Sequence, residues 1–67
     1  MDMDEWMDEL LAALRRQEFT ARQTKIGNWL FGRDGVTVLC GSPETPGEFI
    51  DLVKQLEEIG LVFPEKT

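Results

Sequence analysis

The pair Asp34-Gly35 constrains the fold more than any other part of this chain, because it separates two short apolar runs. Both residues tolerate the positive φ angles that a two-residue type I′ turn requires. The flanking runs, residues 29–33 and 36–40, are rich in aromatic and β-branched side chains, as strands usually are. Together these features predict a β-hairpin.

The length of the turn also sets the register of the hairpin, and with it the face on which each side chain lies. With Arg33 opposite Val36, every second residue of each strand points to the same side of the sheet. The face predicted to turn toward the core consists of Trp29, Phe31, Val36, Val38 and Cys40. Leu30, Leu39 and Asn28 share the other face, where two apolar side chains side by side suit a protein partner or a second copy of the chain.

A helix is predicted before the hairpin, over residues 4–17. Its apolar side chains recur at i, i+3, i+4 and i+7, as they do on the buried face of an amphipathic helix. Acidic residues crowd its first turns, and Arg15 and Arg16 occupy its last turn, which is the arrangement that the helix dipole favours.

A second helix is predicted after the hairpin, over residues 46–59. Thr45 can cap its N-terminus and Glu48 can complete a capping box. Gly60 suits the end of the helix, with Leu61 folding back as the apolar partner of the cap.

Residues 19–24 alternate loosely between apolar and polar side chains, which predicts a strand ahead of the hairpin. The order is then helix, three strands, helix. We therefore predict one two-layer α+β domain, α-β-β-β-α, in which two helices cover one face of a three-stranded antiparallel sheet. A tail, residues 61–67, follows the last helix.

Composition limits the chemistry of the chain. Its 67 residues include one cysteine, Cys40, and no histidine, so neither an internal disulfide nor a zinc cluster is expected. Cys40 is predicted to be a buried apolar residue, since no histidine can activate it as a nucleophile. Neither a metal-binding loop nor a cofactor motif is found. The acidic start leads into no long apolar run, which predicts a cytoplasmic protein that does not bind membranes.

The net charge of −6 argues against nonspecific binding of nucleic acid as the main activity, because phosphate binding depends on Lys and Arg. The charge is unevenly distributed, with acidic ends and a locally basic middle. Arg22, Lys25 and Arg33 in that middle are candidate phosphate contacts, although an ordinary mixed surface would also explain them.

Two segments, LRRQEFTARQTKIGNWLFGRDGVTVLCGS and PETPGEFIDLVKQLEEIGL, resemble the HicA-type mRNA interferase toxins, which have a double-stranded-RNA-binding-domain-like fold. The likeness runs from about residue 9 to residue 61, and its chemically specific part is a Lys and Gly loop before the second strand. Lys25 and Gly27 match that loop. The family's catalytic histidine follows the loop, and here Asn28 stands in its place.

This departure predicts that the chain is not an enzyme, because an amide cannot accept and return a proton near neutral pH. Asn28 has a simpler interpretation as a turn residue whose side chain satisfies nearby backbone groups.

Two functional hypotheses follow. In the first, the chain is a non-catalytic module that binds a protein, and its partner surface includes Leu30, Leu39, Asp4 and Asp8; its carboxylates could also imitate nucleic acid and so inhibit a partner. In the second, it is a toxin-like protein that binds RNA through Arg22, Lys25, Asn28 and Arg33. The missing histidine and the acidic charge favour the first, in a bacterial or phage setting.

Overall fold

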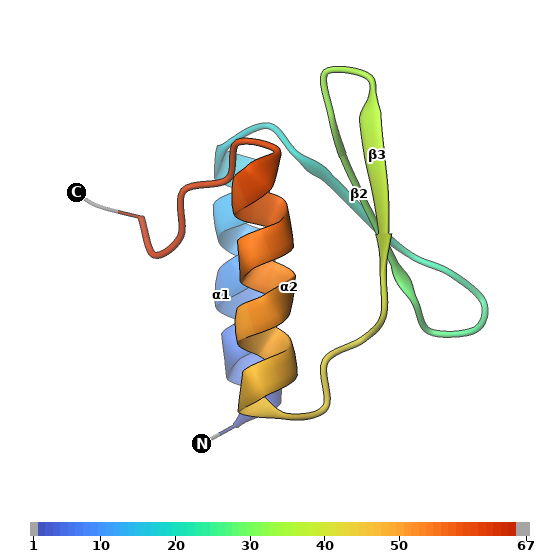
Figure 1. Cartoon of the computed structure of the whole chain (residues 1–67), viewed down its shortest axis with the longest axis vertical. Coiled ribbons are helices and arrows are strands. Elements are labelled where there is room, and N and C mark those ends of the chain that lie inside the picture. The colour runs from blue at the N-terminus through green and yellow to red at the C-terminus, as the bar shows by residue number, and fades with distance from the viewer. Residues whose placement is uncertain (1, 66–67) are drawn as a thin grey trace.

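The computed structural model describes residues 2–65 and confirms the predicted order of helix, three antiparallel strands and helix (Figure 1). The elements are α1 (Met3–Arg16), β1 (Thr20–Gln23), β2 (Trp29–Arg33), β3 (Val36–Cys40) and α2 (Pro46–Glu58). The two helices lie side by side on one face of the sheet, whose strand order is β1-β2-β3. Positions 66 and 67 of the predicted tail lie outside the described residues.

The predicted hairpin and its register are both confirmed. Asp34 and Gly35 have φ angles of 52° and 84°, as a turn with two positive φ angles requires. Phe31 lies opposite Val38, and the pairing continues without a bulge along both strands. The side chains therefore divide between the two faces of the sheet as the turn length predicts.

The first strand is shorter than predicted, because Phe19 belongs to the turn that closes α1 and not to the sheet. Glu18 takes a left-handed conformation with φ 66°, and the Phe19 amide donates to the Leu14 carbonyl at 2.8 Å. The Glu18 amide donates to Arg15 in the same turn, at 3.1 Å. This pair of bonds is a Schellman motif, so Phe19 closes the helix and β1 begins at Thr20.

The ends of α2 agree with the sequence. The Thr45 hydroxyl accepts from the Glu48 amide at 3.2 Å, and the Glu48 carboxylate reaches back to the Glu44 amide at 3.1 Å. At the other end Gly60 has φ 107°, and the Leu61 amide donates to the Leu56 carbonyl at 3.0 Å. Both helices thus end in the same kind of turn.

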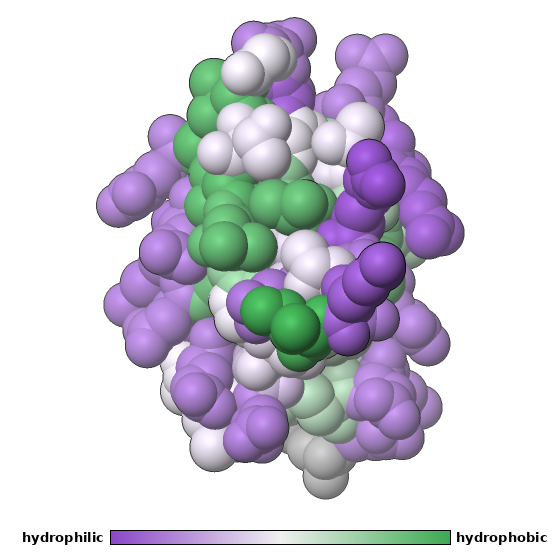
Figure 2. Space-filling view, turned by 90° about the vertical axis from the view of Figure 1, so that its right-hand side faces the viewer, coloured by the Kyte–Doolittle hydropathy of each residue, from purple (hydrophilic) through white to green (hydrophobic). Residues whose placement is uncertain are grey.

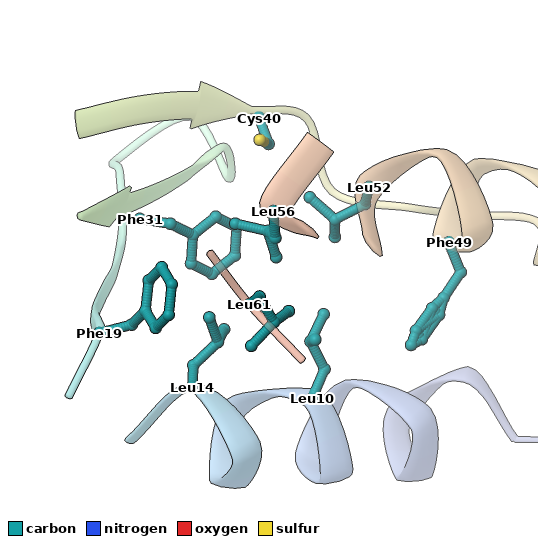
Figure 3. Packing of buried hydrophobic residues seen from close by; sticks show 9 residues of the cluster. All are labelled: Leu10, Leu14, Phe19, Phe31, Cys40, Phe49, Leu52, Leu56 and Leu61. Atoms are coloured by element: carbon teal, nitrogen blue, oxygen red, sulfur yellow. The ribbon is translucent and has the colours of Figure 1, made fainter. Parts of the chain in front are cut away.

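The core lies between the helices and the sheet, where side chains from both layers point into one cluster (Figure 3). Its members are Leu10, Leu14, Phe19, Phe31, Cys40, Phe49, Leu52, Leu56 and Leu61. Phe31 is completely buried. Val36 was predicted to lie under the helices with the rest of this face, but it is 50% exposed because it lies at the hairpin tip, past the end of α2 (Figure 1).

The segment after α2 is held against the end of α1. The Gln17 side chain donates to the Val62 carbonyl at 2.8 Å and accepts from the Val62 amide at 2.9 Å. Arg16 forms an ion pair with Glu65. These contacts hold the tail in place, and its Phe63 packs against the core cluster.

Candidate functional site

The loop between β1 and β2 is a tight turn closed by its own backbone. The Thr24 amide donates to the Asn28 carbonyl at 2.7 Å, and the Asn28 amide donates to the Thr24 hydroxyl at 3.1 Å. Gly27 has φ 89°, a conformation that favours glycine. The sequence interpretation assigned the satisfying side chain to Asn28, but the hydroxyl that performs this role belongs to Thr24.

The two side chains at the tip of this loop are both exposed. Lys25 is exposed, and Ile26 is 83% exposed. Asn28, at the end of the loop, is half-buried. The chain contains no histidine, so this loop carries no imidazole.

The uncovered face of the sheet carries a row of three side chains, one from each strand. Arg22 lies opposite Leu30, and Leu30 lies opposite Leu39. Leu39 is 60% exposed, while Leu30, on the middle strand, is half-buried. Figure 2 shows apolar surface gathered over this face with hydrophilic surface on both sides. The register therefore places an apolar patch with one cation at its margin.

Arg33 does not belong with the other predicted phosphate contacts. It follows Phe31 by two residues on β2, so its side chain points to the same side of the sheet, toward the helices. Its guanidinium carbon lies 5.1 Å from the centre of the Phe19 ring, and its Nη1 donates to the Gly60 carbonyl at 3.4 Å. Arg33 thus joins β2 to the end of α2, whereas Arg22 faces the other side.

The predicted partner residues also divide between two surfaces. Asp4 and Asp8 are exposed on α1, in the helical layer. Leu30 and Leu39 lie on the face of the sheet that the helices leave uncovered. A partner that covers the leucines therefore does not reach the two aspartates through the same contact.

Cys40 is buried, as predicted, and its Sγ lies 3.5 Å from the Gln55 side-chain oxygen. Burial raises the pKa of the thiol, so Cys40 is protonated at neutral pH and unsuited to nucleophilic attack. Within residues 2–65, no group of three or more Cys, Asp or Glu side chains could hold a metal ion.

The sequence interpretation missed a groove in the helical layer, between the two helices and the tail. It has a volume of about 350 Å³, and its walls include Trp6, Ile50, Val53 and Phe63. The centre of the Trp6 ring lies 5.2 Å from that of Phe49, which forms part of the wall. Ile50 stands beside the buried stripe of α2 and is 54% exposed, but the groove also needs the tail residue Phe63, whose position the sequence does not predict.

Comparison of the chain with protein-family models, with curated proteins and with solved structures finds no match. The HicA-type likeness of the loop and of the element order stays a prediction from the residues. Neither helix in the described part of the chain has the length and apolar character that a membrane crossing needs.

Proposed function

We propose that the chain is a non-catalytic, HicA-like module that binds another protein through the uncovered face of its sheet. The observation that supports this most is the row of Arg22, Leu30 and Leu39 across all three strands. Covering the exposed part of Leu39 alone would contribute about 1 kcal/mol to association. From the HicA resemblance we infer a cytoplasmic module in a bacterial or phage setting.

The absence of catalysis in this proposal rests on the loop. Asn28 stands where the resemblance expects a histidine, and a side-chain amide does not act as a general acid or base near neutral pH. Lys25 is exposed at the loop tip, and Cys40 is a buried, protonated thiol. The loop therefore supplies a cation and a turn, but no acid-base pair.

The acidic helices support an inhibitory form of this function. The carboxylates of α1 and α2 are exposed, among them Asp4 and Asp8 one helical turn apart. Such a charged surface can attract a basic nucleic-acid site on another protein and accelerate association. Inhibition of this kind should weaken when Asp4 and Asp8 are both changed to Asn, and also when the salt concentration rises.

A pull-down from bacterial extract tests the protein-binding function. The bait is wild type, Leu30→Lys or Lys25→Ala, and each extract is used with and without nuclease treatment. We expect a protein that survives nuclease treatment, is lost with Leu30→Lys and is retained with Lys25→Ala. Loss on nuclease treatment, with no effect of Leu30→Lys, would contradict binding through this face.

RNA binding is the second candidate, because Arg22 and Lys25 are both exposed and lie near the same loop. Bound RNA that is released by raised salt and by Lys25→Ala would favour it. Degradation of RNA by the purified chain, abolished by Asn28→Ala, would refute the proposal that catalysis is lost.

A further inference from the structure

The outer edge of β3 offers a row of backbone hydrogen-bonding groups that the sheet does not use. β3 is an edge strand, because the sheet order is β1-β2-β3. In a hairpin with a two-residue turn, the two residues that flank the turn form two backbone hydrogen bonds with each other. This pattern repeats at every second position along the strands. Val36, Val38 and Cys40 therefore bond to β2, and the amides and carbonyls of Thr37 and Leu39 point outward.

This edge lacks the features by which proteins usually protect a strand from pairing with another chain. Such protection comes from charged side chains, proline, bulges or very short strands. β3 has five residues, Val36–Cys40, with no charge and no proline, and its pairing with β2 has no bulge. The opposite edge strand is shorter and carries Arg22. The two edges of the sheet therefore differ in their readiness to pair.

The charge beside β3 indicates what kind of strand would pair with it. A hollow of about 250 Å³ lies between the end of β3, the segment after it and α2. Glu48 and Asp51 line it, and no Lys or Arg does. An added strand would place every second side chain on the helical side, toward these carboxylates, and the others beside Leu39 on the open side.

A second copy of the chain fits this edge less well. Two molecules with a net charge of −6 repel each other. A basic strand meets no such repulsion.

We propose that β3 accepts an extended segment of a partner protein in which basic and apolar residues alternate. The pairing would extend the sheet by one strand, with main-chain bonds to Thr37 and Leu39 supplying affinity and the alternating side chains supplying specificity. This inference rests on the proposed protein-binding function and names the chemistry of its partner.

The test uses an acetylated and amidated heptapeptide of alternating Lys and Val, with the Glu and Val heptapeptide as its matched control. Binding to the full chain is followed by NMR, together with hydrogen exchange of the Thr37 and Leu39 amides. We expect the Lys peptide to bind at least about tenfold more tightly than the Glu peptide. Both amides should become protected from exchange only when the Lys peptide is bound.

Variants separate the edge from the face. Thr37→Pro removes an outward donor from β3, while Ala21→Pro does the same on the opposite edge, because Ala21 alternates with Arg22 along β1. Peptide binding should fall at least about tenfold with Thr37→Pro and stay unchanged with Ala21→Pro. Asp51→Lys should narrow or reverse the preference for the Lys peptide. The hydrogen-exchange measurement on the wild-type chain still decides the question if Thr37→Pro does not fold.

Any one of four results would overturn the proposal. The first is peptide binding that leaves the Thr37 and Leu39 amides unprotected. The second is equal binding of the two peptides. The third is a dimer of the chain alone that Thr37→Pro abolishes, since the occupant would then be a second copy. Binding that is lost with Leu30→Lys and kept with Thr37→Pro would overturn the edge proposal while the proposed face-binding function stands.

Discussion

Glu18 holds a backbone conformation that glycine adopts at much lower cost. Its φ angle is 66°, and it occupies the turn after α1 that Gly60, with φ 107°, occupies after α2. A side chain in the left-handed region costs about 1 kcal/mol relative to glycine. The chain therefore uses an unfavourable residue at one of its two equivalent turns.

Replacing Glu18 by Gly should raise the free energy of unfolding by about 0.5–1 kcal/mol, because the positive φ angle costs glycine nothing. Urea unfolding followed by circular dichroism measures the change. Gly60→Ala is the matched control and should destabilise the chain, since an added Cβ would also lie 3.2 Å from the Arg33 Nη1. An unchanged or lowered midpoint for Glu18→Gly would contradict the assigned conformation.

Cys40 should react slowly with thiol reagents at neutral pH. Burial excludes the reagent and raises the thiol pKa, so the reactive thiolate is scarce. The rate with a disulfide reagent should increase strongly in denaturant. A rate in the native chain equal to that in the unfolded chain would contradict the burial of Cys40.

Arg33 shows how far the sequence predicts a single side chain. The sequence grouped it with Arg22 and Lys25 because all three lie in one basic stretch, yet the predicted register already placed it on the side of Phe31. The information needed to separate them was therefore available. Its partner, the Gly60 carbonyl, could not be predicted, since it depends on how α2 lies against the hairpin.

At the scale of the elements, local signals predicted the structure well where one residue determines the geometry. The Asp34-Gly35 turn fixed the hairpin register, and the Thr45 and Glu48 cap fixed the start of α2. β1 was predicted less well, because a residue that closes a helix and a residue that opens a strand look alike in sequence. Phe19 closes α1 in this way.

The tail depends on Gln17, whose side chain bonds to both backbone groups of Val62. Gln17→Ala should lower the free energy of unfolding by about 1–2 kcal/mol, because its two hydrogen bonds to Val62 and its bond to the Glu65 carboxylate are lost and the packing of Phe63 loosens. Thermal unfolding measures the loss, and faster exchange of the Val62 amide locates it. Gln23→Ala, a change at an exposed glutamine of β1, should have little effect on the tail.

Attachment of the tail should also depend on pH. The hydrogen bond from Arg16 holds the pKa of the Glu65 carboxyl below its ordinary value. A carboxyl with a lowered folded-state pKa stabilises the fold above its unfolded pKa, and this contribution disappears as the pH falls through the lowered value. On acidification, the NMR resonances of the tail should shift over the pH range in which Glu65 becomes protonated. Arg16→Ala should move that transition to higher pH.

At the scale of the molecule, one cluster supplies the whole core, and Phe31 is its completely buried member on the sheet. A small domain has little stability to lose. The two-layer arrangement was predictable because both helices have one apolar face. The groove between the helices was not, since it depends on the path of the tail across them.

Phe31→Ala should cost about 3–5 kcal/mol and leave the chain largely unfolded. Circular dichroism at 25 °C would show loss of both helix and strand signals. Phe31→Leu, which keeps most of the volume, should remain folded with a smaller loss. A folded Phe31→Ala variant with unchanged stability would contradict the position of this ring at the centre of the core.

The paired turns after α1 and α2 have a consequence for the motions of the helix ends. Helices commonly fray at their last turn at little cost, but here the residue that closes each turn, Phe19 or Leu61, is itself a core residue. Unwinding either end would pull an apolar side chain into water. The C-terminal turns of both helices should therefore open only when the whole molecule unfolds, with amide exchange as slow there as at the helix centres.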